Sequence, residues 1–365
     1  MSAKHKFLSY RLRSWSQAQE IEAAFAGDDD AKWVFKGHAD ANWRLSSTIE
    51  RTAERFRVPK GRRVGTLHGL IDVERRILTN FRRVAHLHYV DIQRKLFPAG
   101  KVPPSWDCSK PEQLDTSPIE WLALVQHHGG PTRLLDFTKS FWIAAFFALE
   151  AGSTGNVGGE RCVWAVSRAR LWDAARAALG WGEELSWGKL KMHKARLLGN
   201  LASRKCIALD DDWYPMENEK GNAEPEWAPQ VVLPLEPERV NARLNAQQGV
   251  FLFPMQIKKC FLQNLVWTFD CNEERLSGCR DGLQTDFASV DSARKELEQA
   301  AVVKVFMPDR PKEGNTGFCE AQRKRARFRA VKEGLEMLER MGITQATLFP
   351  DLDGAARAQA INVVR

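Results

Sequence analysis

Apolar positions along this chain recur with two different periods. A spacing of three or four residues, as at Leu70, Val73 and Ile77, is typical of a helix with one buried face. This spacing predicts helices over residues 16–27, 67–88, 117–128, 139–150 and 320–341. Short apolar runs rich in Val, Phe and Trp indicate strands instead. Such runs predict strands over residues 32–35, 161–166, 230–235, 249–254, 261–267 and 301–306.

The predicted helices and strands alternate irregularly, without repeated strand–helix–strand units. This order predicts an α+β fold in which a mixed sheet forms the core and helices flank it. The 365 residues allow one large domain or two ordinary ones. Because neither an internal repeat nor a long low-complexity linker divides the chain, we expect a single domain over 1–365, with helix 320–341 packed on it.

Capping residues mark the ends of two of these helices. The S-x-x-Q pattern that begins at Ser16 predicts a capping box, in which two side chains bind the first free backbone N–H groups. Ser117 is the predicted N-cap of the helix that follows it. Gly129 suits the left-handed position just after that helix, so the last helical turn should carry His127 and His128.

Basic residues outnumber acidic ones, 54 to 46, which gives a net charge of +8. The excess favours an anionic partner such as nucleic acid, a dinucleotide or an acidic protein. In the predicted C-terminal helix, Arg325, Arg329 and Lys332 are candidate contacts to nucleic-acid phosphates. A solvated basic face is the structural alternative. The apolar stripe of this helix, which starts with Phe328 and Val331, is expected to point inward.

The sequence argues against several classes of protein. A hydrophobic content of 44% and a charged content of 27% are typical of a globular protein. No apolar run approaches the roughly 18 residues of a transmembrane helix, and the N-terminus has no apolar signal region, so we expect a cytoplasmic chain without a membrane partner. Seven scattered cysteines without a C-x-x-C pair argue against a zinc ribbon, and no metal is expected. The P-loop, G-x-S-x-G and H-E-x-x-H patterns are absent.

Three segments of the chain resemble the FRG domain family. They cover residues 33–51, 121–137 and 241–253. The first contains the name-giving box as Phe35-Lys36-Gly37, with lysine where the family usually shows arginine. Lysine keeps the positive charge but lacks the planar fork that binds an anion through two hydrogen bonds. The second segment is the most specific, because it contains the run QHHGGPTRLLD at residues 126–136.

The resemblance implies a bacterial effector of the toxin or phage-defence type, for which a small antitoxin protein would be a partner. The box is also similar to the aromatic-Arg-Gly box of mono-ADP-ribosyltransferases, in which the arginine contacts NAD. The implied fold is therefore ADP-ribosyltransferase-like, and the implied reaction moves ADP-ribose from NAD to nucleic acid, such as RNA, or to a protein. The implied NAD-binding residues are Phe35, Lys36, Gly37, Trp43, His127 and Gln248.

The candidate catalytic residues are His128, Arg133 and Asp136. Asp136 is the carboxylate best placed to stabilise an oxocarbenium-like charge, and Glu74 and Glu50 are the reserves. Structural explanations remain open for the same residues. The helix macrodipole alone favours histidine at a C-terminal end. Arg133 and Asp136 could form a buried pair, or Asp136 could cap the helix that follows it.

Two other functions remain open at this point. One is a non-catalytic module that senses nucleic acid or a nucleotide in the same pocket. The other is a metal-dependent nuclease, for which Asp210-Asp211-Asp212 would bind Mg²⁺. An acidic triplet in a loop is more often simply solvated.

Overall fold

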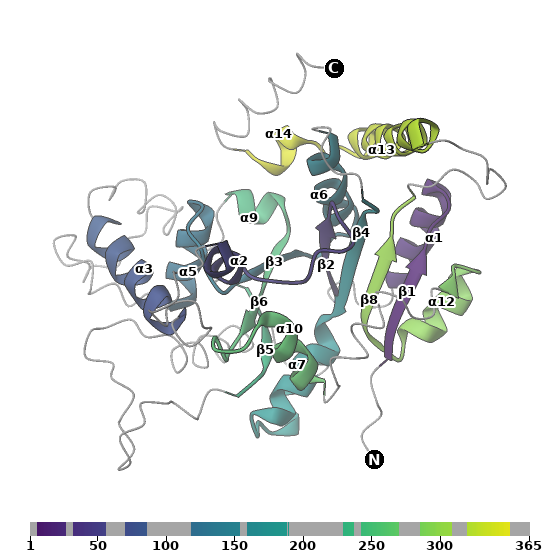
Figure 1. Cartoon of the computed structure of the whole chain (residues 1–365). Coiled ribbons are helices and arrows are strands. Elements are labelled where there is room, and N and C mark those ends of the chain that lie inside the picture. The colour runs from purple at the N-terminus through teal and green to yellow at the C-terminus, as the bar shows by residue number, and fades with distance from the viewer. Residues whose placement is uncertain are drawn as a thin grey trace, which may run out of the picture.

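The protein is described from a computed structural model, in which a mixed sheet runs through the centre of the fold (Figure 1). The structure describes residues 6–26, 32–55, 70–85, 118–153, 159–187, 189, 229–236, 242–269, 285–308 and 320–350. Its strands are β1 (Lys6–Arg11), β2 (Trp33–His38), β3 (Leu135–Thr138), β4 (Cys162–Ser167), β5 (Val232–Leu235), β6 (Gly249–Pro254), β7 (Thr285–Asp286) and β8 (Ala300–Phe306).

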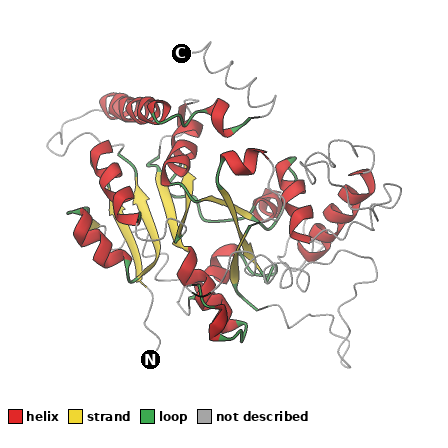
Figure 2. Cartoon of the chain, turned by 180° about the vertical axis from the view of Figure 1, so that it is seen from behind, coloured by secondary structure: helices red, strands yellow, loops and turns green. Residues whose placement is uncertain are grey.

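The helices of these ranges surround the sheet (Figure 2). They are α1 (Trp15–Phe25), α2 (Thr48–Arg55), α3 (Leu70–Ala85), α5 (Pro118–His127), α6 (Phe141–Ser153), α7 (Arg168–Ala178), α9 (Ala242–Ala246), α10 (Phe261–Thr268), α12 (Val290–Leu297), α13 (Glu320–Arg340) and α14 (Gln345–Leu348). None of the helices in the described ranges is long and apolar enough to cross a membrane.

The eight strands of the described chain form one sheet in the order β5-β6-β3-β2-β4-β8-β1-β7. Strand β1 runs parallel to its neighbours β7 and β8, whereas the other neighbouring strands are antiparallel. The sheet is therefore mixed, and the predicted α+β class is confirmed.

Helices cover both faces of the sheet because its central strands are apolar on both sides. On one face, Trp33 and Phe35 of β2 pack in the same cluster as α1, α6 and α13. On the other face, Val34 packs in a cluster with α7 and α10. Helices α3 and α5 join β5 and β6 in a further cluster at one end of the sheet.

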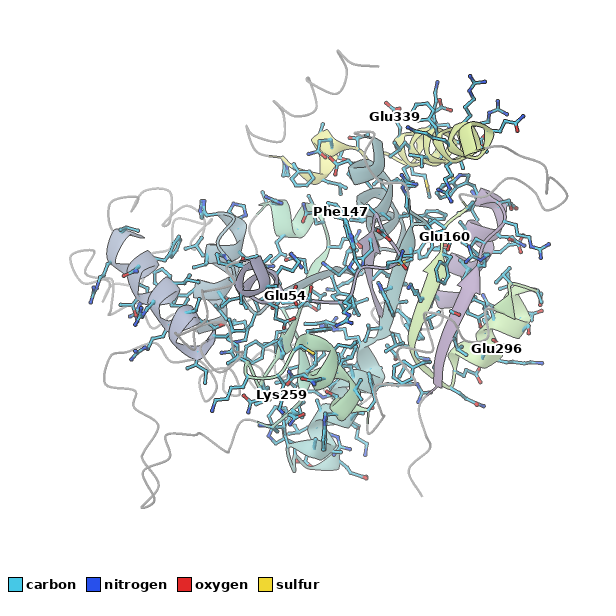
Figure 3. The ribbon with its side chains drawn as sticks, in the orientation of Figure 1. Glu54, Phe147, Glu160, Lys259, Glu296 and Glu339 are labelled. Carbon is cyan, nitrogen blue, oxygen red and sulfur yellow. The ribbon has the colours of Figure 1, made fainter. Side chains whose placement is uncertain are left out.

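Polar contacts hold the opposite end of the sheet. Arg11 of β1 binds the carboxylate of Glu160 through two nitrogens, at 2.8 and 3.0 Å. Glu296 of α12 is labelled in Figure 3. Its carboxylate accepts a hydrogen bond of 2.6 Å from the Tyr10 hydroxyl. These contacts tie β1 to the chain before β4 and to the helix that follows β7.

The strand predicted over 261–267 is wrong, because these residues form α10. Cys260 is the N-cap, and the Gln263 side chain accepts a hydrogen bond of 3.4 Å from its backbone N–H. Phe261 and Leu265, one helical turn apart, are both fully buried. A short apolar run fits a buried helix as well as a strand, and the capping pair decides the outcome here.

Two other element boundaries differ from the prediction. Helix α1 is capped by Ser14, whose hydroxyl accepts a hydrogen bond of 3.3 Å from Gln17, so the S-x-x-Q box begins two residues before Ser16. Strand β2 continues through Lys36 to His38, beyond the predicted end at Phe35. The predicted cap Ser117 and the predicted helix end at Gly27 lie outside the described residues. The left-handed Gly129 is confirmed, with a φ of +80°.

Candidate functional site

The sheet opens between β2 and β3. The two strands are joined by a single residue pair, Phe35 with Thr138. Just beyond that pair, the ammonium of Lys36 donates a hydrogen bond of 3.0 Å to the backbone carbonyl of Asp136. A side chain of β2 therefore reaches the backbone of β3 where regular pairing has stopped.

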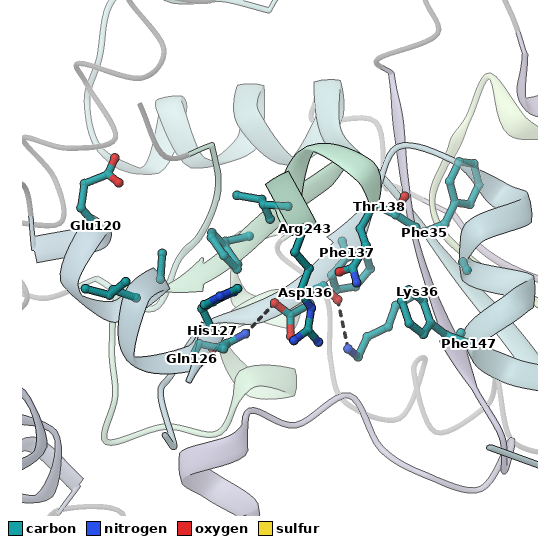
Figure 4. A pocket seen from close by; sticks show the side chains of 17 residues that line it. Phe35, Lys36, Glu120, Gln126, His127, Asp136, Phe137, Thr138, Phe147 and Arg243 are labelled. Atoms are coloured by element: carbon teal, nitrogen blue, oxygen red, sulfur yellow. Dashed lines mark hydrogen bonds between the residues drawn. The ribbon is translucent and has the colours of Figure 1, made fainter. Parts of the chain in front are cut away.

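A pocket of about 330 Å³ lies at this opening (Figure 4). Its lining combines aromatic rings, two cations, carboxylates and amides. The lining residues are Phe35, Lys36, Gly37, Glu120, Ala123, Leu124, Gln126, His127, Asp136, Phe137, Thr138, Ala144, Phe147, Arg243, Leu244, Gln247 and Phe251. This volume is within the range of small-molecule sites, which are about 300–1,000 Å³.

The Asp136 side chain is exposed and held by its neighbours. The Gln126 side-chain amide donates a hydrogen bond of 2.6 Å to the Asp136 carboxylate (Figure 4). The hydroxyl of Thr132 in turn donates to the Gln126 side-chain oxygen. Thr132 also exchanges hydrogen bonds with Thr48, at the start of α2. The carboxylate therefore has a fixed position, set by α5 and the loop between Gly129 and β3.

Lys36 is a cation that lies beside Asp136 along the opening of the sheet. Burial lowers the pKa of its ammonium, the Asp136 carboxylate opposes that shift, and Arg51 adds to it. The ammonium lies 5.9 Å from the centre of the Phe137 ring. A bound anion would favour the charged form of this lysine.

Another part of the pocket wall comes from residues 242–247, a segment that includes α9. Its Arg243 guanidinium lies 4.5 Å above the Phe349 ring, and the Gln247 side chain donates a hydrogen bond of 3.1 Å to the Leu348 carbonyl. Phe349 also makes an edge contact with Phe147, with ring centres 6.1 Å apart. The segment that follows α13 therefore supports two pocket-lining side chains.

Arg133 does not lie in the pocket. Its side chain is 2% exposed and forms a two-pronged ion pair with Glu74 of α3. Its third nitrogen donates a hydrogen bond of 3.1 Å to the Met255 carbonyl. The suggested pairing of Arg133 with Asp136 is wrong, because Arg133 points to α3 and Asp136 lies in β3, where it also caps no helix.

The structure separates the other predicted residues. His127 lines the pocket, whereas His128 is exposed and makes ring contacts with His127 and Phe81. Gln248 is exposed at a turn with a φ of +48°, and its neighbour Gln247 lines the pocket instead.

Trp43 lies outside the pocket, on the loop after β2. Its ring is 52% exposed and packs edge-on against His38, with ring centres 6.2 Å apart. His38 is buried, and its Nδ1 atom has no hydrogen-bond partner. Burial, with a contribution from Lys36, lowers the pKa of His38 to about 3, so its ring is neutral at ordinary pH.

Glu50, a reserve candidate for the catalytic carboxylate, makes hydrogen bonds that stabilise the fold. It forms a capping box with Ser47 at the start of α2, and it accepts a hydrogen bond of 2.9 Å from the Phe261 backbone N–H at the start of α10. Burial raises the pKa of this carboxyl to about 7, although the hydrogen bonds from Phe261 and Ser47 oppose the shift.

Glu50 should make the stability of the fold depend on pH. Its pKa is about 7 in the folded chain and about 4.5 in an unfolded one, so the folded state holds the proton more tightly. The contribution of Glu50 to the free energy of unfolding is therefore fully present below pH 4.5 and is lost as pH rises through 7. From pH 5 to pH 8 the loss is about 2.5 kcal/mol. Urea unfolding at pH 5 and pH 8 should show that the free energy of unfolding decreases less, by this amount, in Glu50→Gln than in the unaltered chain. An equal decrease in both proteins would contradict the assignment.

The predicted phosphate contacts lie on α13 and not in the pocket. Arg325, Arg329 and Lys332 are all exposed. Val331 is buried as expected, but Phe328 is 66% exposed, so its predicted inward orientation is wrong. Phe328 lies among the basic residues on the outer side of the helix, whereas Val331 faces the core.

The described residues contain no group of three or more histidine, cysteine or acidic side chains that could hold a metal ion. Asp210-Asp211-Asp212 lies outside the described residues. Cys162 and Cys260, the two cysteines within the described ranges, are not joined in a disulfide.

The prediction missed Gln126, Arg243 and Gln247 as individual site residues. Gln126 stands one position before the two histidines, and it had no distinguishing feature of its own. Arg243 lies in α9 and Gln247 directly after it; they are four residues apart, a helical spacing that places both on one side. This spacing can be recognised in the sequence. The two residues are far from residues 126–136 along the chain, however, so the sequence does not indicate that they share a pocket.

These features define an α+β protein with a polar and aromatic pocket at the opening of a mixed sheet. Residues 31–156 match the family model of the FRG domain. The match covers about a third of the chain and includes β2, β3 and α5, but not α9. No curated protein and no solved structure matches the chain.

Proposed function

We propose that this chain binds NAD in the pocket between β2 and β3 and transfers its ADP-ribose group to a nucleic-acid or protein acceptor. One observation carries the proposal: a carboxylate fixed by Gln126 shares a pocket with Lys36, Arg243 and several aromatic rings. A phosphate-bearing ligand with a flat ring needs cations and aromatic walls together.

The pocket residues have separate tasks in this reaction. Lys36 and Arg243 would bind the pyrophosphate, and Phe137 would support the nicotinamide ring. At about 330 Å³ the pocket suits the nicotinamide–ribose half of NAD. The bond between ribose C1′ and the ring nitrogen breaks, and neutral nicotinamide leaves with the electron pair. Asp136 stabilises the oxocarbenium-like charge at C1′ until an acceptor oxygen or nitrogen attacks there and loses a proton to solvent.

Asp136→Asn should slow nicotinamide release by about 100-fold, the usual effect of removing one transition-state electrostatic contact. NAD labelled in the adenylate and NAD labelled in nicotinamide would be incubated with RNA, DNA and lysate proteins. Asp291→Asn is a matched control, because Asp291 is an exposed aspartate on α12. Absence of both label transfer and nicotinamide release with the unaltered chain would end the proposal.

A second candidate is a pocket that binds a nucleotide or nucleic acid without turnover. It is favoured by the finding that only one of the three predicted catalytic residues, Asp136, lines the pocket. Calorimetric titration with NAD would then give binding that Asp136→Asn leaves unchanged and Lys36→Ala weakens, with no nicotinamide released.

We also propose that the chain acts as a toxin-type effector in bacterial defence, neutralised by a small antitoxin protein. Expression should then arrest growth, and Asp136→Asn should relieve the arrest at an equal protein level. Arg133→Ala does not test this idea, because Arg133 belongs to a buried ion pair and its loss would alter folding. Growth that is unaffected by the unaltered chain would count against the toxin role.

A further inference from the structure

Helix α13 presents a fixed outer face. Its inner face is anchored by Val331 and Leu338, which are buried in the same cluster as α6. The Trp15 indole donates a hydrogen bond of 3.0 Å to the Ala330 carbonyl. The Trp15 ring also packs so tightly against Gly334 that a Cβ there would lie 2.2 Å from it. The helix therefore cannot rotate without breaking these contacts.

The outer face of the N-terminal half of α13 is basic and carries one aromatic ring. The exposed side chains on it are those of Lys324, Arg325, Phe328, Arg329 and Lys332. No acidic residue occurs from 324 to 332, whereas Glu333, Glu336 and Glu339 follow in the second half. Figure 3 shows side chains of α13, Glu339 among them, projecting away from the sheet.

Helix stability does not explain this arrangement. Arg325 and Arg329 are four residues apart, where like charges repel each other on a helix surface. The basic half is also the N-terminal half, whereas the helix macrodipole favours cations near the C-terminus. Lys332 pairs with Glu336 on this helix at 3.8 Å, and both side chains are more than half exposed. Such pairs contribute little. A bound polyanion would relieve the repulsion.

We propose that this outer face of α13 binds single-stranded nucleic acid. The cations neutralise consecutive phosphates, and Phe328, which is 66% exposed, offers a ring on which an unpaired base can stack. A membrane surface fits less well, because a membrane-bound helix needs a continuous apolar face, and the apolar face of α13 is buried in the protein. The inference deepens the proposed function by placing the docking site of a nucleic-acid acceptor, but binding itself needs no NAD.

The test uses the full chain and a fluorescein-labelled 20-nucleotide RNA of mixed sequence, followed by fluorescence anisotropy between 50 and 300 mM salt. The affinity should fall linearly on a double-logarithmic plot, with a slope of about 0.7 for each phosphate neutralised. The double variant Arg325→Glu/Arg329→Glu should bind at least about tenfold more weakly and show a shallower slope. Phe328→Ala should also lose about tenfold in affinity but keep the slope, because stacking releases no ions.

Arg340→Glu is the matched control, since Arg340 is exposed on the same helix beyond the basic half. It should bind like the unaltered chain. DNA of the same sequence shows whether binding depends on ribose or deoxyribose. Tighter binding of single-stranded RNA or single-stranded DNA than of the duplex supports the proposal. Equal binding by all variants, tighter binding of the duplex, or binding of phosphatidylserine vesicles in place of RNA would each overturn it.

The two proposals can fail independently. If NAD is not consumed but RNA binding depends on Arg325, Arg329 and Phe328, the proposed docking surface is supported and the proposed reaction is wrong. If NAD is consumed and RNA binding does not depend on these residues, the proposed reaction is supported and the proposed docking surface is wrong.

Discussion

Arg133→Ala will lower the free energy of unfolding by about 3–5 kcal/mol, the usual loss when one partner of a buried ion pair is removed. The Glu74 carboxylate would stay in the core without its cation, because both side chains are no more than 3% exposed. The Met255 carbonyl would also lose its donor. Urea unfolding followed by circular dichroism measures this loss directly.

Two further variants identify the cause of this loss. Arg329→Ala removes an exposed arginine from α13 and should change stability by less than about 0.5 kcal/mol. Arg133→Met combined with Glu74→Leu removes both charges and fills the space, so it should recover most of the stability. If Arg133→Ala folds with unchanged stability but fails to bind NAD, the residue belongs to the site and the structural assignment is wrong.

Arg133 shows why sequence alone could not sort structural from functional residues. Its partner Glu74 is 59 positions away in the sequence, on α3. The nearest carboxylate along the chain was Asp136, at a spacing that allows contact in a helix. The segment instead continues into β3, where Asp136 points away from the core and Arg133 precedes the strand. Local spacing cannot predict an ion pair between distant elements.

Local patterns predicted about half of the elements in the described ranges, and they missed β1, β3 and α7 among others. The runs at 161–166 and 301–306 correspond to β4 and β8, and the spacing at 67–88 corresponds to α3. The run at 261–267 failed because a short apolar segment has no period that separates helix from strand. The decisive contacts were the capping pair of Cys260 and Gln263.

The candidate site was only partly predictable for the same reason. Residues 126–136 contribute Gln126, His127 and Asp136 to the pocket, as the motif suggested. Arg243 lies in the pocket because β6, the strand just after α9, pairs with β3. Sheet order depends on contacts across the whole chain, and no pattern within a single segment encodes it.

Gly37 is one of the residues implied to bind NAD, and it lies in β2. The close neighbour is helix α6, because a Cβ on Gly37 would lie 1.9 Å from the Ala144 carbonyl oxygen and 2.7 Å from the Ala148 nitrogen. Both are backbone atoms, so no side-chain rotation can make room. The glycine of the box therefore sets the distance between strand and helix.

Gly37→Ala should accordingly destabilise the fold by about 3 kcal/mol or more, because the added methyl group forces α6 away from the sheet. Gly129→Ala is the matched control: Gly129 has a φ of +80° and nothing within 4 Å of an added Cβ, so only backbone strain of about 1–2 kcal/mol is expected. Thermal unfolding of the two variants measures the difference. Since Ala144 and Phe147 of α6 line the pocket, Gly37→Ala should also weaken NAD binding in molecules that remain folded. A smaller loss in Gly37→Ala than in Gly129→Ala would show that α6 can move away at little cost.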